Sequence, residues 1–279
     1  MNNGVDLHLH STASDGKYTP SQLVQLALRK KLRAIALTDH DTTDGIEEAL
    51  SAAQQTGLTV IPGVEISTNV SGDLELHILG YHVDHRHAPL QKRLQELRES
   101  RLVRAREILR LLAKAGLPLP WERVLAMAGH GSIGRPHIAQ AMVEANYVNS
   151  VENAFRLYIG RGGPAYVERY KLAPQDAIEL VRQAGGLPVL AHPSQVTEYI
   201  PSLVQAGLAG LEVYYSGYEE AEKQSLAKLA GKHGLIATGG SDFHGPGITS
   251  ATELGQVDVP WSAVEQLQAQ WQADGDARP

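Results

Sequence analysis

The chain has 279 residues, a formal net charge of −6 at pH 7 and no cysteine, and 43% of its residues are hydrophobic. This size and apolar content suffice for one large globular domain or for a domain that carries an insertion. The charge gives no general attraction to nucleic acid or anionic membranes, and the absence of cysteine excludes disulfides and thiolate metal sites. The start of the chain shows no signal-peptide pattern, and no run of about 18 apolar residues occurs, so we expect a cytoplasmic protein.

The first predicted element is a strand in "VDLHLH" (5–10), where apolar and polar residues alternate. Side chains two positions apart point to the same face of a strand, so His8 and His10 should lie side by side at its end. The stretch "STASDG" (11–16) then indicates a loop that carries Asp15. A histidine pair alone is more often a surface or hydrogen-bonded pair than a metal site.

Short apolar runs alternate with helical patterns along both halves of the chain. The strand-like runs are "GVDLHLH", "LRAIALTDH", "LTVIPGVEIS", "LELHILGYHV", "LPVLAHP", "LEVYYS" and "LIATGGSDFH". Repeated strand-then-helix order is typical of a largely parallel sheet or barrel, here with about seven strands. We therefore expect an α/β barrel formed by residues 1–85 and 165–279.

Between these halves the pattern predicts helices only, over 88–115, 120–129, 136–146 and 150–158. We interpret residues 86–164 as an inserted helical subdomain that binds substrate. Its first part is basic, which is usually the mark of a solvated helix face. Arg101 and Arg104, however, fall on or beside the apolar stripe of the long helix, where an arginine needs a partner, an anion or access to water for its head group.

Imidazole and carboxylate groups occur at or near the ends of most predicted strands. They are His8, His10, Asp15, His40, Glu65, His77, His192, Asp242 and His244. In α/β barrels the carboxyl ends of the strands converge on one face, where active sites are built. Without thiols, such groups suit Zn²⁺, Mn²⁺ or Fe²⁺, and nine ligands are too many for one ion. Hydrogen-bonded core histidines are the alternative, but this density of buried polar groups needs an explanation.

These motifs resemble the polymerase and histidinol phosphatase (PHP) family of metal-dependent phosphoesterases. The resemblance rests on "DLHLHSTASDG", "LTDHDTTDG", "PGVEIS", "ELHILGY", "VLAHP" and "GSDFHG" in this order. It implies a distorted (β/α)7-type barrel, and the family's metal positions match all nine residues. It also implies two or three divalent ions, with Mn²⁺ expected first and Zn²⁺ or Fe²⁺ as alternatives.

Within the family, the length and the helical insertion look most like phosphatases that act on nucleoside 3′,5′-bisphosphates and leave a nucleoside 5′-phosphate. Related members trim short RNA from its 5′ end. The stretch "GHGSIGRPHIAQAMVEANY" (129–147) carries much of this narrower match. Here Ser132 and Gly134 precede a helix whose N-terminal N–H groups attract anions, beside Arg135 and His137. We expect this segment to hold the second phosphate, although such a glycine-rich stretch is also an ordinary helix start.

The expected catalytic residues are Glu65, Asp242 and His192. Glu65 and Asp242 would be shared between the ions, which would lower the pKa of a water for in-line attack on phosphorus. Arg135 and His137 would hold the distal phosphate, with Arg101 and Arg104 as weaker candidates. The group that protonates the leaving ribose oxygen is left open.

Other functions fit parts of the same pattern. A histidinol-phosphate phosphatase would need an acidic partner for the substrate amine, and a nuclease would need an open basic groove. A polymerase-associated module would bind metal without turnover, and an amidohydrolase could use the same kind of metal centre. We expect a small-molecule substrate or short RNA, and neither a membrane nor an obligate protein partner.

Overall fold

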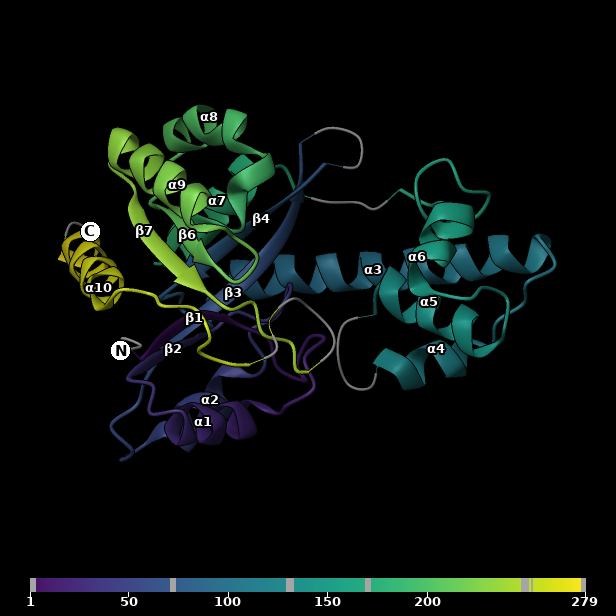
Figure 1. Cartoon of the computed structure of the whole chain (residues 1–279), viewed down its shortest axis with the longest axis horizontal. Coiled ribbons are helices and arrows are strands. Elements are labelled where there is room, and N and C mark those ends of the chain that lie inside the picture. Colours follow the sequence, from purple (N-terminus) through teal and green to yellow (C-terminus); the bar gives the residue numbers. More distant parts are fainter. Residues whose placement is uncertain are drawn as a thin grey trace. The chain divides into compact units, whose positions relative to one another are not determined.

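The computed structural model describes residues 4–70, 74–128, 133–168, 172–246, 251 and 253–276. The chain divides into two compact units, which we call the barrel unit (Met1–Lys92 with Leu172–Pro279) and the helical unit (Arg93–Lys171) (Figure 1). The helical unit begins and ends later than the 86–164 insertion that the sequence predicts. Helix α3 (Ala88–Lys114) runs through the first boundary without a break, so no change of pattern marks it.

Seven strands form a single sheet in chain order, as the alternating apolar runs predict. They are β1 (Val5–Leu9), β2 (Ala34–Leu37), β3 (Thr59–Asn69), β4 (Glu75–Tyr81), β5 (Leu187–Leu190), β6 (Gly210–Tyr215) and β7 (Ile236–Gly240). Neighbouring strands pair in parallel, except that β4 is antiparallel to both β3 and β5. The barrel is therefore interrupted by one reversed strand.

Backbone hydrogen bonds join the end of β1 to the segment that follows β7. The N–H of His10 donates to the carbonyl of Phe243 (3.1 Å), and the N–H of Asp242 donates to the carbonyl of His8 (2.9 Å). Leu9 and Phe243 form a parallel bridge between these bonds. The two ends of the sheet thus meet, and the predicted distorted α/β barrel is confirmed.

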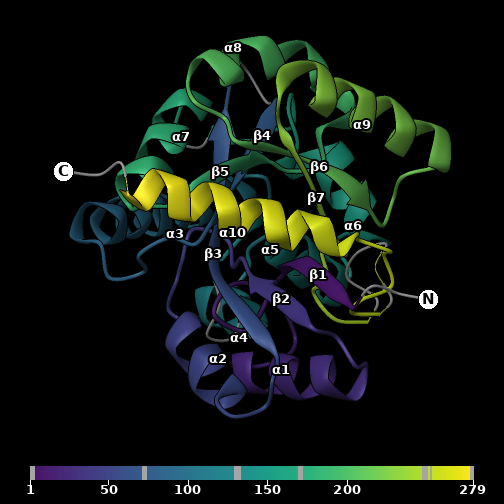
Figure 2. The ribbon, with the colours of Figure 1, turned by 90° about the vertical axis from the view of Figure 1, so that its left-hand side faces the viewer.

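Helices cover the outside of the barrel unit. Figure 2 shows α1 (Pro20–Arg29) and α2 (Ile46–Ala53) on one side of the sheet and α7 (Pro174–Gln183), α8 (Ile200–Gln205) and α9 (Glu220–His233) on the other. Two short 3₁₀ helices, Pro193–Gln195 and Thr197–Tyr199, precede α8. Helix α10 (Trp261–Asp276) lies across one end of the barrel, where its apolar residues share a core cluster with residues of β1 to β5.

Helix α1 shows how local sequence fixes these elements. Thr19 Oγ1 accepts a hydrogen bond from the N–H of Gln22, and Gln22 Oε1 accepts one from the N–H of Thr19. This capping box satisfies two backbone donors at the helix start, where Pro20 needs no partner. The buried residues Leu23, Val24 and Ala27 recur at helical spacing and pack on the apolar outer side of β2.

The helical unit has its own apolar core. Besides α3 it contains α4 (Trp121–Ala128), α5 (Arg135–Glu144), α6 (Val151–Ala154) and a π-helical turn η1 (Phe155–Ile159). These match the four helices that the sequence predicts, with the last one divided at Phe155. Ile108, Leu112, Ile138, Met142 and Ile159 are fully buried members of one cluster. Among the described residues of the chain, no helix is long and apolar enough to cross a membrane.

Candidate metal centre

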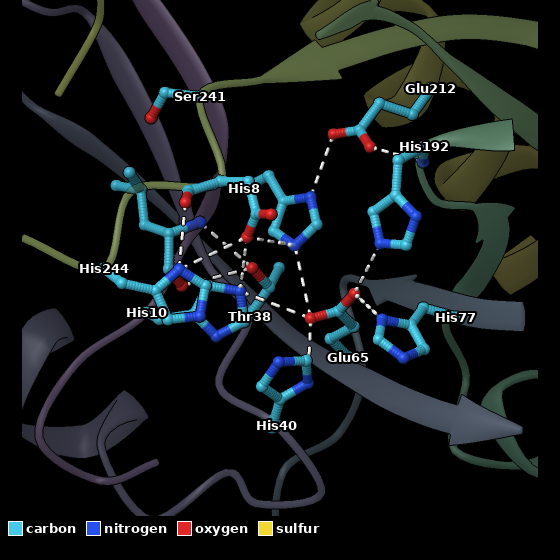
Figure 3. A network of polar contacts seen from close by, with 12 residues as sticks. His8, His10, Thr38, His40, Glu65, His77, His192, Glu212, Ser241 and His244 are labelled. Carbon is cyan, nitrogen blue, oxygen red and sulfur yellow. Dashed lines mark hydrogen bonds and ion pairs between the residues drawn. The ribbon is translucent and has the colours of Figure 1, made fainter. Parts of the chain in front are cut away.

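The nine predicted ligands of the barrel unit come together in one cluster (Figure 3). They are His8 in β1, His10 and Asp15 after it, His40 after β2, Glu65 in β3, His77 in β4, His192 after β5, and Asp242 and His244 after β7. Each is linked to another member by a nitrogen–oxygen distance below 4.0 Å. The expectation that one rim of the barrel collects these groups therefore agrees with the structure.

The reversed direction of β4 explains how His77 joins the cluster. His77 lies near the beginning of β4 and pairs with Ser67 close to the end of β3. Its carbonyl accepts a hydrogen bond from the N–H of Ala191, which directly follows β5. In an antiparallel pair the start of one strand lies beside the end of the next, so His77 reaches the rim formed by the ends of the parallel strands.

Glu65 lies at the centre of the cluster and is almost fully buried. Five imidazoles lie within 3.3 Å of its two carboxylate oxygens, namely His8, His10 and His40 at Oε2 and His77 and His192 at Oε1. A carboxylate has about four lone-pair sites for acceptance, fewer than these imidazoles need. Its position suits a ligand shared by more than one cation.

Two further carboxylates flank Glu65. Asp242 Oδ1 lies 3.1 Å from His10 Nε2, 3.4 Å from His8 Nε2 and 3.5 Å from His244 Nδ1. Asp15 Oδ1 lies 3.3 Å from Nε2 of the same His244 ring. Asp15 is also the most exposed of the nine side chains, at 31% of its full accessibility. The loop that holds Asp15 is thus the part of the cluster nearest to solvent.

The donor atoms form three overlapping groups, each with ligand atoms within 4.8 Å of one another. The groups are His10, Asp15, His40 and His244; His8, His10, Glu65 and Asp242; and His40, Glu65 and His77. His10, His40 and Glu65 each belong to two of them. His192 is in none of these groups, but its Nε2 lies 3.3 Å from Glu65 Oε1.

Several donor atoms in the cluster are buried and have no hydrogen-bond partner of acceptable geometry. They are His8 Nε2, both ring nitrogens of His10, His40 Nδ1, Asp15 Oδ1 and Glu65 Oε2. A buried polar atom without a partner is costly, and native proteins rarely contain so many in one place. Bound divalent cations would satisfy all of them at once, so this set of nitrogen and oxygen donors fits metal ions.

The pKa values of the cluster follow from burial and from the close packing of opposite charges. Burial raises the pKa of Glu65, but the imidazoles of His40, His77 and His8 outweigh it and hold this pKa well below its usual range. Burial lowers the pKa of His10, yet the carboxylates of Asp242 and Glu65 raise it overall to about 10. The carboxylate of Glu65 is therefore charged and ready to bind cations, whereas metal binding must displace a proton from His10.

Two of the predicted ligands have a left-handed backbone, which non-glycine residues seldom adopt. His192 has φ 30° and ψ 57°, and Asp242 has φ 56°. Each is the second residue after a strand of the barrel, His192 after β5 and Asp242 after β7. The N–H of Asp242 donates a hydrogen bond to the carbonyl of His8. The N–H of His192 donates to a carboxylate oxygen of Glu212 at 2.7 Å. Such strain is typical of functional sites, where surrounding contacts impose it.

Sequence reasoning missed Glu212 as a partner of the cluster. Glu212 lies in β6, is completely buried, and accepts a hydrogen bond from His8 Nδ1 at 2.9 Å. The one signal in the sequence is an acidic residue within the apolar strand "LEVYY". Tyr215 in the same strand also contacts the cluster, through Asp242.

Asp39 supports the loop that carries Asp15. Its carboxylate accepts hydrogen bonds from the N–H and the hydroxyl of Ser11, both at 2.7 Å, and from the hydroxyl of Ser14 at 2.5 Å. All three residues are buried. Asp39 precedes the predicted ligand His40 but does not itself belong to the cluster, so its role is to fix the loop backbone.

The predicted phosphate-binding residues belong to the helical unit. Gly134 caps the N-terminus of α5, and its N–H donates to Nδ1 of His137 at 3.0 Å. The guanidinium of Arg135 lies 5.4 Å from the centre of the Phe155 ring. Ser132 lies outside the described residues. These residues stay predictions for phosphate binding.

Arg101 and Arg104 lie in α3 and are half-buried. The Nε of Arg104 donates to the carbonyl of Val167 at 2.7 Å. This backbone carbonyl is the kind of partner that the sequence predicts for an arginine beside the apolar stripe. Their role in substrate binding also stays a prediction.

Comparison with known proteins identifies the family. A PHP domain model matches residues 6–116, which contain six of the nine clustered residues. A 5'-3' exoribonuclease of Haemophilus influenzae is 38% identical over 253 residues, covering 88% of this chain and 92% of that protein. The chain belongs to the PHP family. A 3',5'-nucleoside bisphosphate phosphatase of Chromobacterium violaceum is 34% identical over 251 residues, covering 87% of this PHP protein and 88% of the relative.

The solved structures agree with this assignment. A PHP-fold protein of Bifidobacterium adolescentis, assigned as a metal-dependent phosphoesterase, superposes with a TM-score of 0.84 at 32% identity and covers 96% of both chains. With its clustered imidazoles and carboxylates, the present PHP protein is a metal-dependent phosphoesterase. The resemblance that the strand-end motifs indicate is thereby confirmed.

Proposed function

We propose that this PHP enzyme removes the 3′-phosphate of nucleoside 3′,5′-bisphosphates and leaves the nucleoside 5′-phosphate, and that it also trims short RNA from the 5′ end. The observation that carries the proposal is the set of three overlapping donor groups, which share His10, His40 and Glu65. The names of the relatives in Haemophilus influenzae and Chromobacterium violaceum support both substrate classes.

The nine clustered residues would hold two or three divalent ions, with Mn²⁺ as the expected metal. When bound, the ions would activate water for attack and neutralise charge on the phosphoryl oxygens. Glu65 and Asp242 would be shared between ions, because each faces imidazoles from several strands. His192 would contribute from the side of Glu65 that faces β5.

The helical unit would recognise the second phosphate through Gly134, Arg135 and His137. Because Nδ1 of His137 accepts from the N–H of Gly134, its proton sits on Nε2, which can donate to an anion. Arg135 supplies a permanent positive charge beside the same helix N-terminus. Binding energy from this second phosphate would favour bisphosphates over monophosphates.

The test is a phosphate-release assay on enzyme stripped with a chelator and reloaded with Mn²⁺, Zn²⁺ or Mg²⁺. Substrates are a nucleoside 3′,5′-bisphosphate, the corresponding 3′- and 5′-monophosphates, histidinol phosphate and a short 5′-phosphorylated RNA. We expect kcat/KM to be highest for the bisphosphate with Mn²⁺, with nucleoside 5′-phosphate as the product, and mononucleotides to be released from the RNA.

Each competing function gives a different outcome in this assay. Preference for histidinol phosphate or another sugar phosphate would replace the substrate assignment. Equal turnover of the bisphosphate and the monophosphates would contradict recognition of the second phosphate. Metal binding without release of phosphate from any substrate would favour a module that binds metal without catalysis.

A further inference from the structure

Both oxygens of the Glu212 carboxylate are used by the metal centre (Figure 3). Oε1 accepts from the ring nitrogen Nδ1 of His8 at 2.9 Å, and Oε2 accepts from the backbone N–H of His192 at 2.7 Å. Glu212 and His8 are both fully buried. A carboxylate in such a place needs partners for its charge, and both partners here are predicted metal ligands.

The bond to Glu212 determines which nitrogen of His8 can bind a cation. A charged carboxylate only accepts hydrogen bonds, so Nδ1 of His8 must carry a proton. The lone pair of the neutral ring then lies on Nε2. This nitrogen is buried without a hydrogen-bond partner and faces Glu65 Oε2 and Asp242 Oδ1 at 3.3 and 3.4 Å.

The bond to His192 acts on the backbone instead of the ring. His192 is left-handed at φ 30°, and the residue after it is Pro193. Its N–H is directed at Glu212 Oε2, which compensates for this unfavourable conformation. With the backbone held, Nε2 of His192 reaches Glu65 Oε1 at 3.3 Å.

We infer that Glu212 is a positioning residue that fixes the ring of His8 and the backbone of His192 so that both can bind metal. The inference rests on the proposed metal centre and adds to it a shared anchor between β1 and the loop after β5. Glu212 binds no cation itself. A carboxylate behind a metal-binding imidazole sets its tautomer and orientation, and loss of such a partner typically lowers metal affinity about 10- to 100-fold.

Glutamine is the informative substitution, because it keeps the size of Glu212 and changes one acceptor into a donor. Glutamine has a single amide oxygen, which can accept from only one of the two donors, the backbone N–H of His192 or Nδ1–H of His8. In the first arrangement the amide nitrogen of glutamine meets Nδ1 of His8 as a donor. The neutral ring of His8 must then carry its proton on Nε2 instead of Nδ1. This blocks the nitrogen that would bind the cation.

The experiment compares Mn²⁺ binding to wild type and to Glu212→Gln by calorimetry, with the number of bound ions measured by elemental analysis. We expect Glu212→Gln to bind Mn²⁺ about 10- to 100-fold more weakly or to lose an ion. Tyr218→Phe is the matched control, since it removes the hydroxyl that accepts from the N–H of Ser194 at 3.0 Å in the same loop. The control should bind Mn²⁺ as the wild type does.

A second measurement keeps the inference testable if Glu212→Gln fails to fold. In ¹⁵N-histidine-labelled wild type loaded with diamagnetic Zn²⁺, NMR should show His8 protonated at Nδ1 and coordinated through Nε2. His8 coordinated through Nδ1 would overturn the inference, as would unchanged Mn²⁺ binding by Glu212→Gln. If the wild type bound no Mn²⁺, the proposed metal centre itself would fail, which is a distinguishable result.

Discussion

The hydroxyl of Tyr215 donates a hydrogen bond of 3.0 Å to Oδ2 of Asp242. This contact leaves Oδ1 of the same carboxylate to face His8, His10 and His244. Burial and the negative charge of Asp242 raise the pKa of Tyr215, so that the phenol keeps its proton. Tyr215 thus fixes the rotation of a carboxylate that is predicted to bridge metal ions.

Tyr215→Phe should therefore weaken metal binding without abolishing it. Loss of one hydrogen bond to a partly buried carboxylate corresponds to about 1.4 kcal/mol, or roughly a tenfold rise in the Kd for Mn²⁺. Calorimetric titration of the metal-free enzyme measures this change. Tyr214→Phe is the control, because Tyr214 packs against the main core cluster of the barrel unit. Identical Mn²⁺ affinity of Tyr215→Phe and wild type would contradict the role given to the phenol.

The overlap of the donor groups predicts unequal effects of two histidine substitutions. His10 belongs to two of the three groups and His77 to one. His10→Ala should therefore lose more bound metal per chain than His77→Ala, and its phosphatase activity should fall by at least about 100-fold. Metal content after dialysis is measured by elemental analysis, and circular dichroism confirms folding. Equal metal content in the two variants would show that the groups do not represent separate ion positions.

Arg135→Ala tests the proposed recognition of a second phosphate. We expect the KM for a nucleoside bisphosphate to rise about 10- to 100-fold, the effect of losing a charge-assisted hydrogen bond, with a smaller change in kcat. The KM for a nucleoside monophosphate should stay the same. Arg110→Ala removes an exposed arginine that pairs with Glu107 on α3 and serves as the control. A similar rise in KM for both substrates would argue against a dedicated phosphate contact.

His82 gives a pH-dependent contribution to stability away from the metal centre. Its ring stacks on Trp271 of α10 at 4.9 Å, and burial lowers its pKa from 6.5 to about 4. Between about pH 4 and pH 6.5 the ring therefore stays neutral in the native state, whereas it takes up a proton in the unfolded chain. The contribution of His82 to the free energy of unfolding is therefore present above pH 6.5 and is lost as the pH falls towards 4.

His82→Asn isolates this contribution, because asparagine tolerates the left-handed backbone at this position (φ 56°) and does not titrate. The free energy of unfolding is measured in urea at pH 7 and at pH 5. Between these values it should fall more for the wild type than for the variant. NMR titration of His82 measures its pKa directly. A midpoint near the usual value of 6.5 would disprove the prediction.

The cluster of predicted ligands could be derived from the sequence because most of its members lie in or after apolar runs. Strands that alternate with helices place their carboxyl ends together, so His40, His192 and Asp242 could be assigned to one rim without coordinates. His77 was named from its position in a predicted strand, but periodicity does not reveal that β4 runs in the opposite direction. Only pairing with β3 and β5 brings it to the same rim.

The supporting residues were harder to predict, since hydrogen bonds between distant segments leave no periodic trace. Glu212 and His8 are 204 positions apart, and Tyr215 resembles any other strand tyrosine in the sequence. The boundary of the helical unit was likewise hidden, because α3 keeps one helical pattern across Lys92 and Arg93.

The closure between β1 and the segment after β7 has a consequence during synthesis of the chain. His8 leaves the ribosome long before Asp242, whose N–H donates a hydrogen bond to the carbonyl of His8. A nascent chain that has emerged only as far as β6 therefore lacks Asp242 and His244 and cannot complete the donor groups around His10. Phosphoesterase activity is thus expected only after the segment that follows β7 has been synthesised, and products truncated before Asp242 should lack it.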